Sequence, residues 1–189
     1  SALINTLDNT RRSLNMDQVS QTIAVLAEAK RVAFLGVGGG STNIAAEAAT
    51  RFFRLGIPAE SQSDGYLQRM LVSTFGPGDV VFAISASGLP QELIDSVAIA
   101  REYGAATLSL TRTASPLASA CDLAITIDLP ENPDIFKPTA SRHAFLAIID
   151  VLASGVARTR PEQTRETLRR IRSSLVVVFN DTRPTPIGD

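Results

Sequence analysis

The chain has 189 residues, a formal net charge of −1 and 44% apolar residues, which suffices for one full hydrophobic core and is too short for two ordinary domains. The charge balance argues against a nucleic-acid surface in this sequence, because a phosphate backbone attracts a positive field. One cysteine and one histidine exclude a disulfide and the usual zinc sets, and no apolar run approaches the roughly 18 residues of a membrane span. We therefore expect a cytoplasmic protein without metal or cofactor.

Apolar runs of strand length alternate with segments of helical periodicity, which is typical of a parallel sheet covered by helices on both faces. Residues 1–16 show little pattern and are interpreted as an N-terminal arm. Val19, Ile23 and Leu26 then mark one face of an amphipathic helix over 17–30. The predicted strands are 31–37, 58–62, 80–85, 106–111 and 123–128, and the predicted helices between them are 42–55, 64–75, 90–103 and 115–121.

Two further helices are predicted at 139–157 and 161–178, followed by a C-terminal tail at 180–189. The first of them is apolar nearly all round, so every side must be covered, either by the core or by a second subunit. We expect one face to pack on the sheet and the opposite face to pair with a second copy, which predicts at least a homodimer. The arginines of the last helix are interpreted as a solvated face.

Five strands in this alternation predict a three-layer αβα sandwich with the flavodoxin-like strand order 2-1-3-4-5. Ligands bind such sheets where the chain reverses direction, here between strands 1 and 3. Two loops of small residues follow these strands, Gly-Val-Gly-Gly-Gly-Ser at 36–41 and Ser-Ala-Ser-Gly at 85–88. Each opens a helix, where free backbone N–H groups and the positive dipole end favour an anion. Their joint placement predicts a phosphate site.

Simpler interpretations exist for each loop. The first could be a turn that lets strand and helix pack closely. It could also begin a Rossmann dinucleotide site, in which Gly36 and Gly38 start G-x-G-x-x-G, Ser41 replaces the third glycine and Glu60 binds the ribose. That interpretation leaves the second loop without a role. The second loop could merely cap the next helix, although its two serines exceed what one cap requires.

Three segments of the chain together resemble the SIS (sugar isomerase) domain: Leu-Gly-Val-Gly-Gly-Gly-Ser at 35–41, Ile-Ser-Ala-Ser-Gly at 84–88, and Pro-Thr-Ala-Ser-Arg at 138–142 with the apolar run that follows. More narrowly, they resemble the effector-binding half of RpiR-type bacterial transcriptional regulators, and the resemblance covers about residues 3–178. It implies that residues 17–179 form a phosphosugar-binding SIS domain.

The region 3–30 is similar to the linker helix that joins a helix-turn-helix domain to the SIS domain in those regulators. The resemblance therefore implies that DNA is contacted only through a domain outside this sequence. The implied function is to sense a phosphorylated sugar or sugar acid as the effector of such a regulator, with no membrane partner.

In SIS domains, the serine after the glycine-rich loop and the serines of S-x-S-G bind the phosphate or adjacent hydroxyls of a phosphosugar. The family pattern usually continues S-G-x-T, and Pro90 stands at the threonine position. One phosphate donor is thus lost, and Gln91 is the candidate to replace it. The phosphosugar-binding residues implied by the resemblance are Gly40, Ser41, Ser85, Ala86, Ser87, Gly88, Gln91, Thr139 and Ser141.

The alternative function is that of a SIS-type sugar-phosphate isomerase or lyase. Such an enzyme needs a general base within reach of the sugar, and the candidates are Glu47, Glu92 and His143. His143 shares a helix face with Asp150, but seven residues separate them by about 10 Å along the axis. That separation is too long for a direct pair. We therefore expect no catalytic residues and no enzyme.

Overall fold

Five segments pair side by side into one all-parallel sheet in a computed structural model that describes residues 2–129 and 141–179. The strand order is β2-β1-β3-β4-β5, which confirms the predicted order. The ends of the strands differ from the predicted ends by at most two residues. The strands are β1 (Arg31–Gly36), β2 (Ala59–Gln62), β3 (Asp79–Ser85), β4 (Ala106–Thr111) and β5 (Leu123–Thr126).

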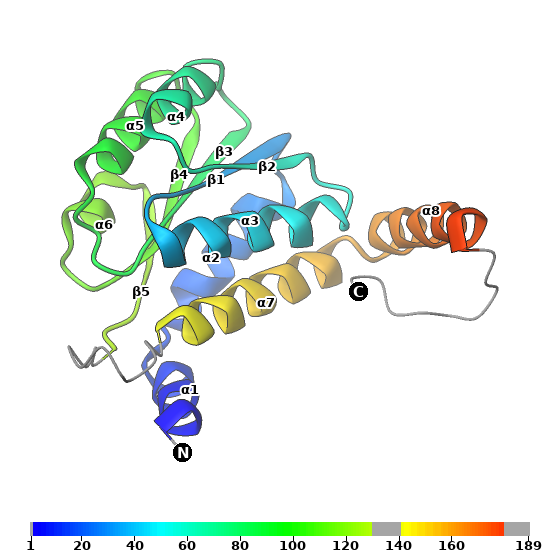
Figure 1. The fold of residues 1–189 in the computed structure, drawn as a ribbon, viewed down its shortest axis with the longest axis horizontal. Helices are drawn as coiled ribbons and strands as arrows, with labels where there is room; N and C mark the ends of the chain where they lie inside the picture. The colour runs from blue at the N-terminus through cyan, green and yellow to red at the C-terminus, as the bar shows by residue number, and fades with distance from the viewer. Residues whose placement is uncertain (1, 130–140, 180–189) are drawn as a thin grey trace.

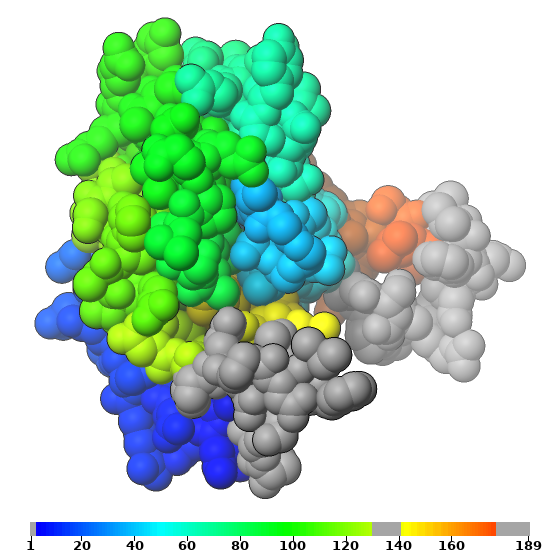
Figure 2. All heavy atoms as spheres, turned by 60° about the vertical axis from the view of Figure 1, so that its left-hand side comes forward, coloured from blue at the N-terminus to red at the C-terminus, as the bar shows by residue number. Residues whose placement is uncertain are grey.

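Helices cover both faces of this sheet and complete the three predicted layers (Figure 1). One face carries α2 (Met16–Ala27), α3 (Gly39–Phe53) and α7 (Ser141–Thr159). The other face carries α4 (Gly65–Val72), α5 (Gln91–Glu102) and α6 (Pro116–Ala120). The first helix, α1 (Ala2–Ser13), and the last, α8 (Pro161–Phe179), extend from the body of the molecule in both overall views (Figures 1 and 2).

The alternation of side chains along the strands divides the core into two halves. In β3, Phe82 and Ile84 face α3 and α7, whereas Val81 and Ala83 face α4 and α5. Phe82 stacks at 5.5 Å, between ring centroids, against a phenylalanine of β1. All of these β3 side chains are fully buried, so the sheet is a rigid base for the loops at its edge.

The register of the sheet brings the ends of its central strands together. Gly36 pairs with Ile84, and Ser85 pairs with Thr111. Thr111 in turn pairs with Thr126 of β5. The segments that follow β1, β3, β4 and β5 therefore leave the sheet at one edge, next to one another.

The apolar helix α7 is covered within the chain, and the expectation that its outer face is left for a second subunit is wrong. It packs against α1, α2 and α3 as well as the sheet. Among its large apolar side chains, Val151 is the exposed one, at 43%. The sequence pattern showed that this helix needs cover on most sides, but three other helices of the same chain provide it.

The N-terminal residues form a regular helix, although their sequence showed little pattern. Helix α1 packs on α7 and leaves Leu3, Ile4 and Leu7 exposed by 40%, 66% and 37%. The spacing of Leu3 and Leu7, four residues apart, is the helical signal that the sequence interpretation overlooked. None of the helices in the described parts of the chain is both long enough and apolar enough to cross a membrane.

Candidate functional site

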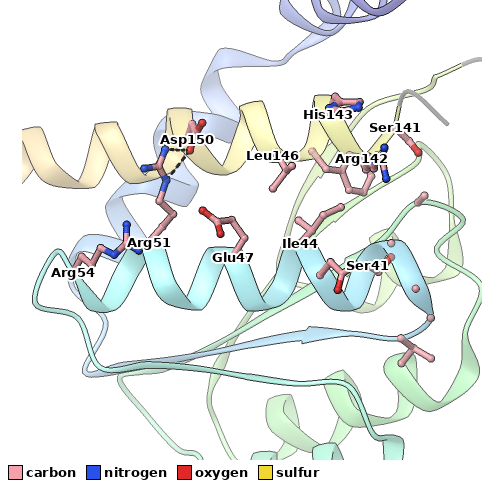
Figure 3. Close-up of a pocket in the computed structure, with 17 residues that line it drawn as sticks. Ser41, Ile44, Glu47, Arg51, Arg54, Ser141, Arg142, His143, Leu146 and Asp150 are labelled. Carbon is pink, nitrogen blue, oxygen red and sulfur yellow. Dashed lines mark hydrogen bonds and ion pairs between the residues drawn. The ribbon is translucent and has the colours of Figure 1, made fainter. Parts of the chain in front are cut away.

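A cleft of about 1090 Å³ opens between α3 and α7, beside the carboxyl ends of β1 and β3 (Figure 3). Its walls are the first loop at 37–41, one face of α3 and the first half of α7. The cleft thus lies where the chain reverses direction in the sheet, as predicted for a ligand site in this topology.

The two helices that form the walls both begin at the same end of the cleft. Ser41 at the start of α3 and Ser141 at the start of α7 lie at that end, whereas Arg51 and Asp150 lie at the other (Figure 3). Because the N-terminus of a helix carries its positive dipole end, two such ends meet beside the glycine-rich loop. This end of the cleft favours an anion.

Helix capping leaves backbone donors free at the same edge. Asn15, Asp64 and Ser115 cap α2, α4 and α6 through their side chains. In contrast, the N-cap residues of α3 and α5 are Gly38 and Pro90, and neither helix has a side-chain cap hydrogen bond. The first N–H groups of a helix lack partners within the helix. The two helices that follow the Gly/Ser loops therefore keep donors available for a bound group.

The four glycines of the first loop have different roles. A Cβ on Gly36 would overlap the carbonyl oxygen of Ser41, so this glycine permits close packing of strand and helix. Gly38 has a φ of +82°, which disfavours other residues. Gly39 and Gly40 have open space where a Cβ would lie. The close-packing interpretation thus explains half of the loop, and the other half exposes backbone to the cleft.

The second loop is held in shape by its own serines. The Oγ of Ser85 accepts a hydrogen bond from the N–H of Gly88 at 3.0 Å, and the Oγ of Ser87 accepts one from the N–H of Leu89 at 3.3 Å. Ser85 is only 3% exposed. Neither serine caps α5, so the simple capping interpretation does not apply.

Gly88 is fixed from the other side by the segment after β4. It has a φ of +66°, and a Cβ there would lie 2.6 Å from the Oγ1 of Thr111 and would overlap Ser115. The carbonyl of Gly88 also accepts a hydrogen bond from the N–H of Leu117 at 3.2 Å. The second loop is therefore locked between β3 and α6.

A second, smaller cavity of about 290 Å³ adjoins the cleft. Ser87, Arg112 and Asp128 line it. Ala86 and Ser141 line both the cavity and the cleft. The carboxyl ends of β3, β4 and β5 supply most of this cavity, so the two hollows together span the edge of the sheet.

The structure brings most of the predicted ligand-binding residues to these two hollows. Gly40, Ser41, Ala86 and Ser141 line the cleft, and Ser87 lines the smaller cavity.

The other predicted residues lie elsewhere. Ser85 and Gly88 are the buried residues of the second loop, and they line neither hollow. Gln91 donates a hydrogen bond to Asp95 at 2.8 Å on the surface of α5, so it does not replace the donor lost at Pro90. Thr139 falls outside the described residues.

Two arginines of the cleft, Arg51 and Arg142, were not among the predicted site residues. Glu47 points from α3 toward α7, and Arg142 lies beside Ser141 (Figure 3). Arg51 donates from its Nε to Asp150 at 2.8 Å. The spacing of Glu47 and Arg51, four residues apart, places both on one helix face. That spacing was the available signal.

The proposed catalytic candidates are not arranged as a pair. His143 and Glu47 line the cleft, whereas Glu92 contacts Gly65 outside it. Asp150 is engaged by Arg51. Among the described residues, no group of three His, Cys, Asp or Glu side chains could hold a metal ion.

The chain is similar in sequence to one protein family and to two transcriptional regulators. The SIS domain family matches residues 25–155. The HTH-type transcriptional regulator HexR of Escherichia coli (strain K12) is 39% identical over 170 residues, which cover 90% of this chain and 58% of that protein. HexR of Pseudomonas aeruginosa is 38% identical over 176 residues, which cover 93% of this chain and 61% of that protein. The chain thus spans about three fifths of the length of these two regulators.

Solved structures share the fold. The Vibrio vulnificus NanR protein complexed with ManNAc-6P has a TM-score of 0.83 at 23% identity, covering 96% of this chain and 68% of that one. The sugar isomerase domain of the RpiR transcription factor from Sphaerobacter thermophilus has a TM-score of 0.81 at 20% identity, covering 90% of this chain and 94% of that one. At these identities the likeness establishes the fold alone.

Proposed function

This chain belongs to the SIS domain family, and we propose that it binds a phosphorylated sugar or sugar acid as the effector-binding domain of an RpiR-type transcriptional regulator. The observation that carries this proposal is the anion-favouring end of the cleft. The uncapped start of α3, the open backbone of Gly39 and Gly40, and the hydroxyls of Ser41 and Ser141 meet there. A phosphate accepts several such hydrogen bonds at once.

The rest of the cleft suits a sugar. Beyond the serines it offers a carboxylate at Glu47, cations at Arg51 and Arg142, and an apolar surface at Leu146. Sugar hydroxyls both donate and accept hydrogen bonds, so they can donate to the carboxylate and accept from the arginines. Hydroxyl and backbone donors also leave the ligand exchangeable, as a domain that reports a metabolite level requires.

The regulatory role is supported by two relatives whose names identify them as HTH-type transcriptional regulators. Because this chain spans about three fifths of their length, we propose that DNA is bound by a part of the protein outside this sequence. The net charge of −1 agrees with that division of labour. Such a regulator would work in the cytoplasm, where its DNA and its effector meet.

Enzymatic isomerisation is the second candidate, and a specific observation keeps it open. Glu47 points into the cleft and has the chemistry of a general base. Against it, Glu47 is exposed, and Asp150 is paired with Arg51 instead of orienting His143. We therefore propose a binding domain without catalysis.

A thermal-shift screen tests the proposal. The panel is glucose 6-phosphate, fructose 6-phosphate, ribose 5-phosphate and 6-phosphogluconate, each beside its unphosphorylated parent. A ligand that binds the native state stabilises it by RT ln(1 + [L]/Kd). We expect at least one phosphorylated compound to raise Tm while its parent does not. Equal shifts with both members of every pair, or no shift at all, would contradict a phosphosugar site.

A further inference from the structure

The smaller cavity contains a charge that the Gly/Ser loops do not supply. Arg112 follows β4 directly and lines this cavity together with Ser87 and Ser141. Arg69 and Arg101 each form an ion pair with an aspartate. Arg112 forms no ion pair or hydrogen bond with any of the residues that the structure describes. A guanidinium that no described residue pairs with, beside two hydroxyls, is equipped to receive an anion.

The sheet register fixes the position of this arginine relative to the second loop. Ser85 and Thr111 are partners across β3 and β4, so Ser87 and Arg112 both lie just past the ends of paired strands. Hydrogen bonds then tie the two segments together. Leu117 donates to the carbonyl of Gly88 at 3.2 Å. Arg112 and Ser87 therefore form one surface of fixed geometry.

The segment that carries Arg112 is itself held in place. The N–H of Thr113 donates to Asp128 at 3.1 Å, and the Oγ of Ser115 accepts from the N–H of Ala118 at 3.2 Å. Between them, Ala114 has a φ of +53°, a region that alanine seldom adopts. The neighbouring contacts thus impose one backbone shape on the turn. Asp128 shares the cavity and has one oxygen engaged by Thr113.

We propose that Arg112 is the charged anchor of the ligand's phosphate, which it holds in the smaller cavity beside Ser87. This rests on the proposed function. Pro90, at the start of α5, has no N–H to offer, and Ser87 supplies a hydroxyl without charge. A guanidinium adds two parallel donors and a full positive charge, which a phosphate accepts in bidentate form.

This placement also orients the rest of the ligand. Ala86, Ser141 and Phe145 border both hollows. A phosphate beside Arg112 therefore directs the sugar past these residues into the larger cleft, toward Glu47 and Arg142. The phosphate is then bound where the two hollows meet, beside Ser141 and near the start of α3, and the sugar contacts the rest of α3 and α7.

Calorimetric titration of single variants tests the anchor. The probes are the four phosphorylated compounds of the thermal-shift panel and their parents. Arg112→Gln should weaken binding of the phosphorylated compounds by roughly 10- to 150-fold, the range for loss of hydrogen bonds to a charged group. The affinity of Arg112→Lys should lie between those of wild type and Arg112→Gln, because an ammonium keeps the positive charge but lacks the two parallel donors of a guanidinium. Arg158→Gln, which removes another exposed arginine from the far end of α7, is the matched control.

The outcomes separate this inference from the proposed function. Wild-type affinity in Arg112→Gln, with binding lost in Arg142→Gln instead, would place the phosphate on the cleft side of Ser141 and overturn the anchor alone. Absence of binding to any phosphorylated compound by the wild-type chain would overturn both. A loss confined to Arg112→Gln, with Tm unchanged and a smaller dependence of Kd on salt, supports the anchor.

Discussion

Arg51 of α3 and Asp150 of α7 join the two walls of the cleft at the end away from the glycine-rich loop (Figure 3). Their side chains are 40% and 52% exposed. The pair bridges the two walls, so a ligand in the cleft meets an ion pair toward one end and helix N-termini at the other.

The energy of this pair should be small. A double-mutant cycle of Arg51→Ala and Asp150→Ala is expected to give a coupling energy of about 0.2–1 kcal/mol in urea unfolding, because exposed ion pairs gain little over water. The coupling should fall further in 0.5 M salt. A coupling of several kcal/mol would mean that the pair is a main support of the α3–α7 contact.

Two glycines of the first loop should respond in opposite ways to alanine. Gly40→Ala places a methyl group in open space at the anion end of the cleft, so stability should stay within about 1 kcal/mol of wild type while phosphosugar affinity falls. Gly36→Ala forces a Cβ onto the backbone of Ser41 and should destabilise by about 1–3 kcal/mol or more. Thermal unfolding and calorimetric titration, carried out on both variants, measure the contrast. Equal effects on stability would be incompatible with this division of roles.

The two serines of the second loop should also differ. Ser85→Ala leaves the buried N–H of Gly88 without its acceptor, which should cost about 1–3 kcal/mol of stability. Ser87 is exposed and lines the smaller cavity. Ser87→Ala should therefore weaken phosphosugar binding by roughly 10- to 150-fold with little change in Tm. A stability loss in Ser87→Ala and a pure binding loss in Ser85→Ala would reverse the assignment.

The domain is expected not to interconvert aldose and ketose phosphates at enzymic rates. Glu47 and His143 line the cleft, and within residues 2–129 and 141–179 neither is hydrogen-bonded to a side chain that would orient it as a base. Coupled assays with glucose 6-phosphate and fructose 6-phosphate measure turnover, and Glu47→Gln is the control for any trace activity. Turnover above about 1 s⁻¹, which is ordinary for enzymes, and its loss in Glu47→Gln would establish the isomerase instead.

Assembly is expected to use α1 in place of the outer face of α7. Leu3, Ile4 and Leu7 are exposed on α1, and full burial of such side chains contributes about 1.5–3 kcal/mol each. Light scattering should report at least twice 20.1 kDa, and Ile4→Asp should reduce this mass. Tyr66→Asp on α4, where the side chain is 73% exposed, is the matched control. A monomeric mass for the wild-type chain would contradict the expectation that the chain forms a dimer.

The strands and their order could be predicted because each strand is a short apolar run between turn residues, and parallel connection leaves few possible orders. The cover of α7 could not be predicted in the same way. Periodicity shows how many sides of a helix are apolar, but it does not identify the neighbour that buries them. In this fold, α1, whose own apolar stripe is exposed at Leu3 and Ile4, is one of those neighbours.

The candidate site divides along similar lines. Gly40, Ser41 and Ser87 belong to motifs that directly follow predicted strands, so their place at the edge of the sheet could be predicted. Arg112 belongs to no motif, because it is a single residue after β4 whose relevance depends on the register between β3 and β4. The hydrogen bond from Gly88 to the Ser85 hydroxyl could not be predicted either. The S-x-S-G motif reads the same whether a serine faces a ligand or the loop itself.

Helix α7 forms a wall of the cleft and also packs against α1. The N-terminal helix is therefore separated from the ligand by the thickness of a single helix. If a ligand shifted α7 toward α3, the contact between α7 and α1 would pass that shift on to α1. The contact between α1 and α7 is thus the shortest route by which a change in the cleft could reach the N-terminal helix.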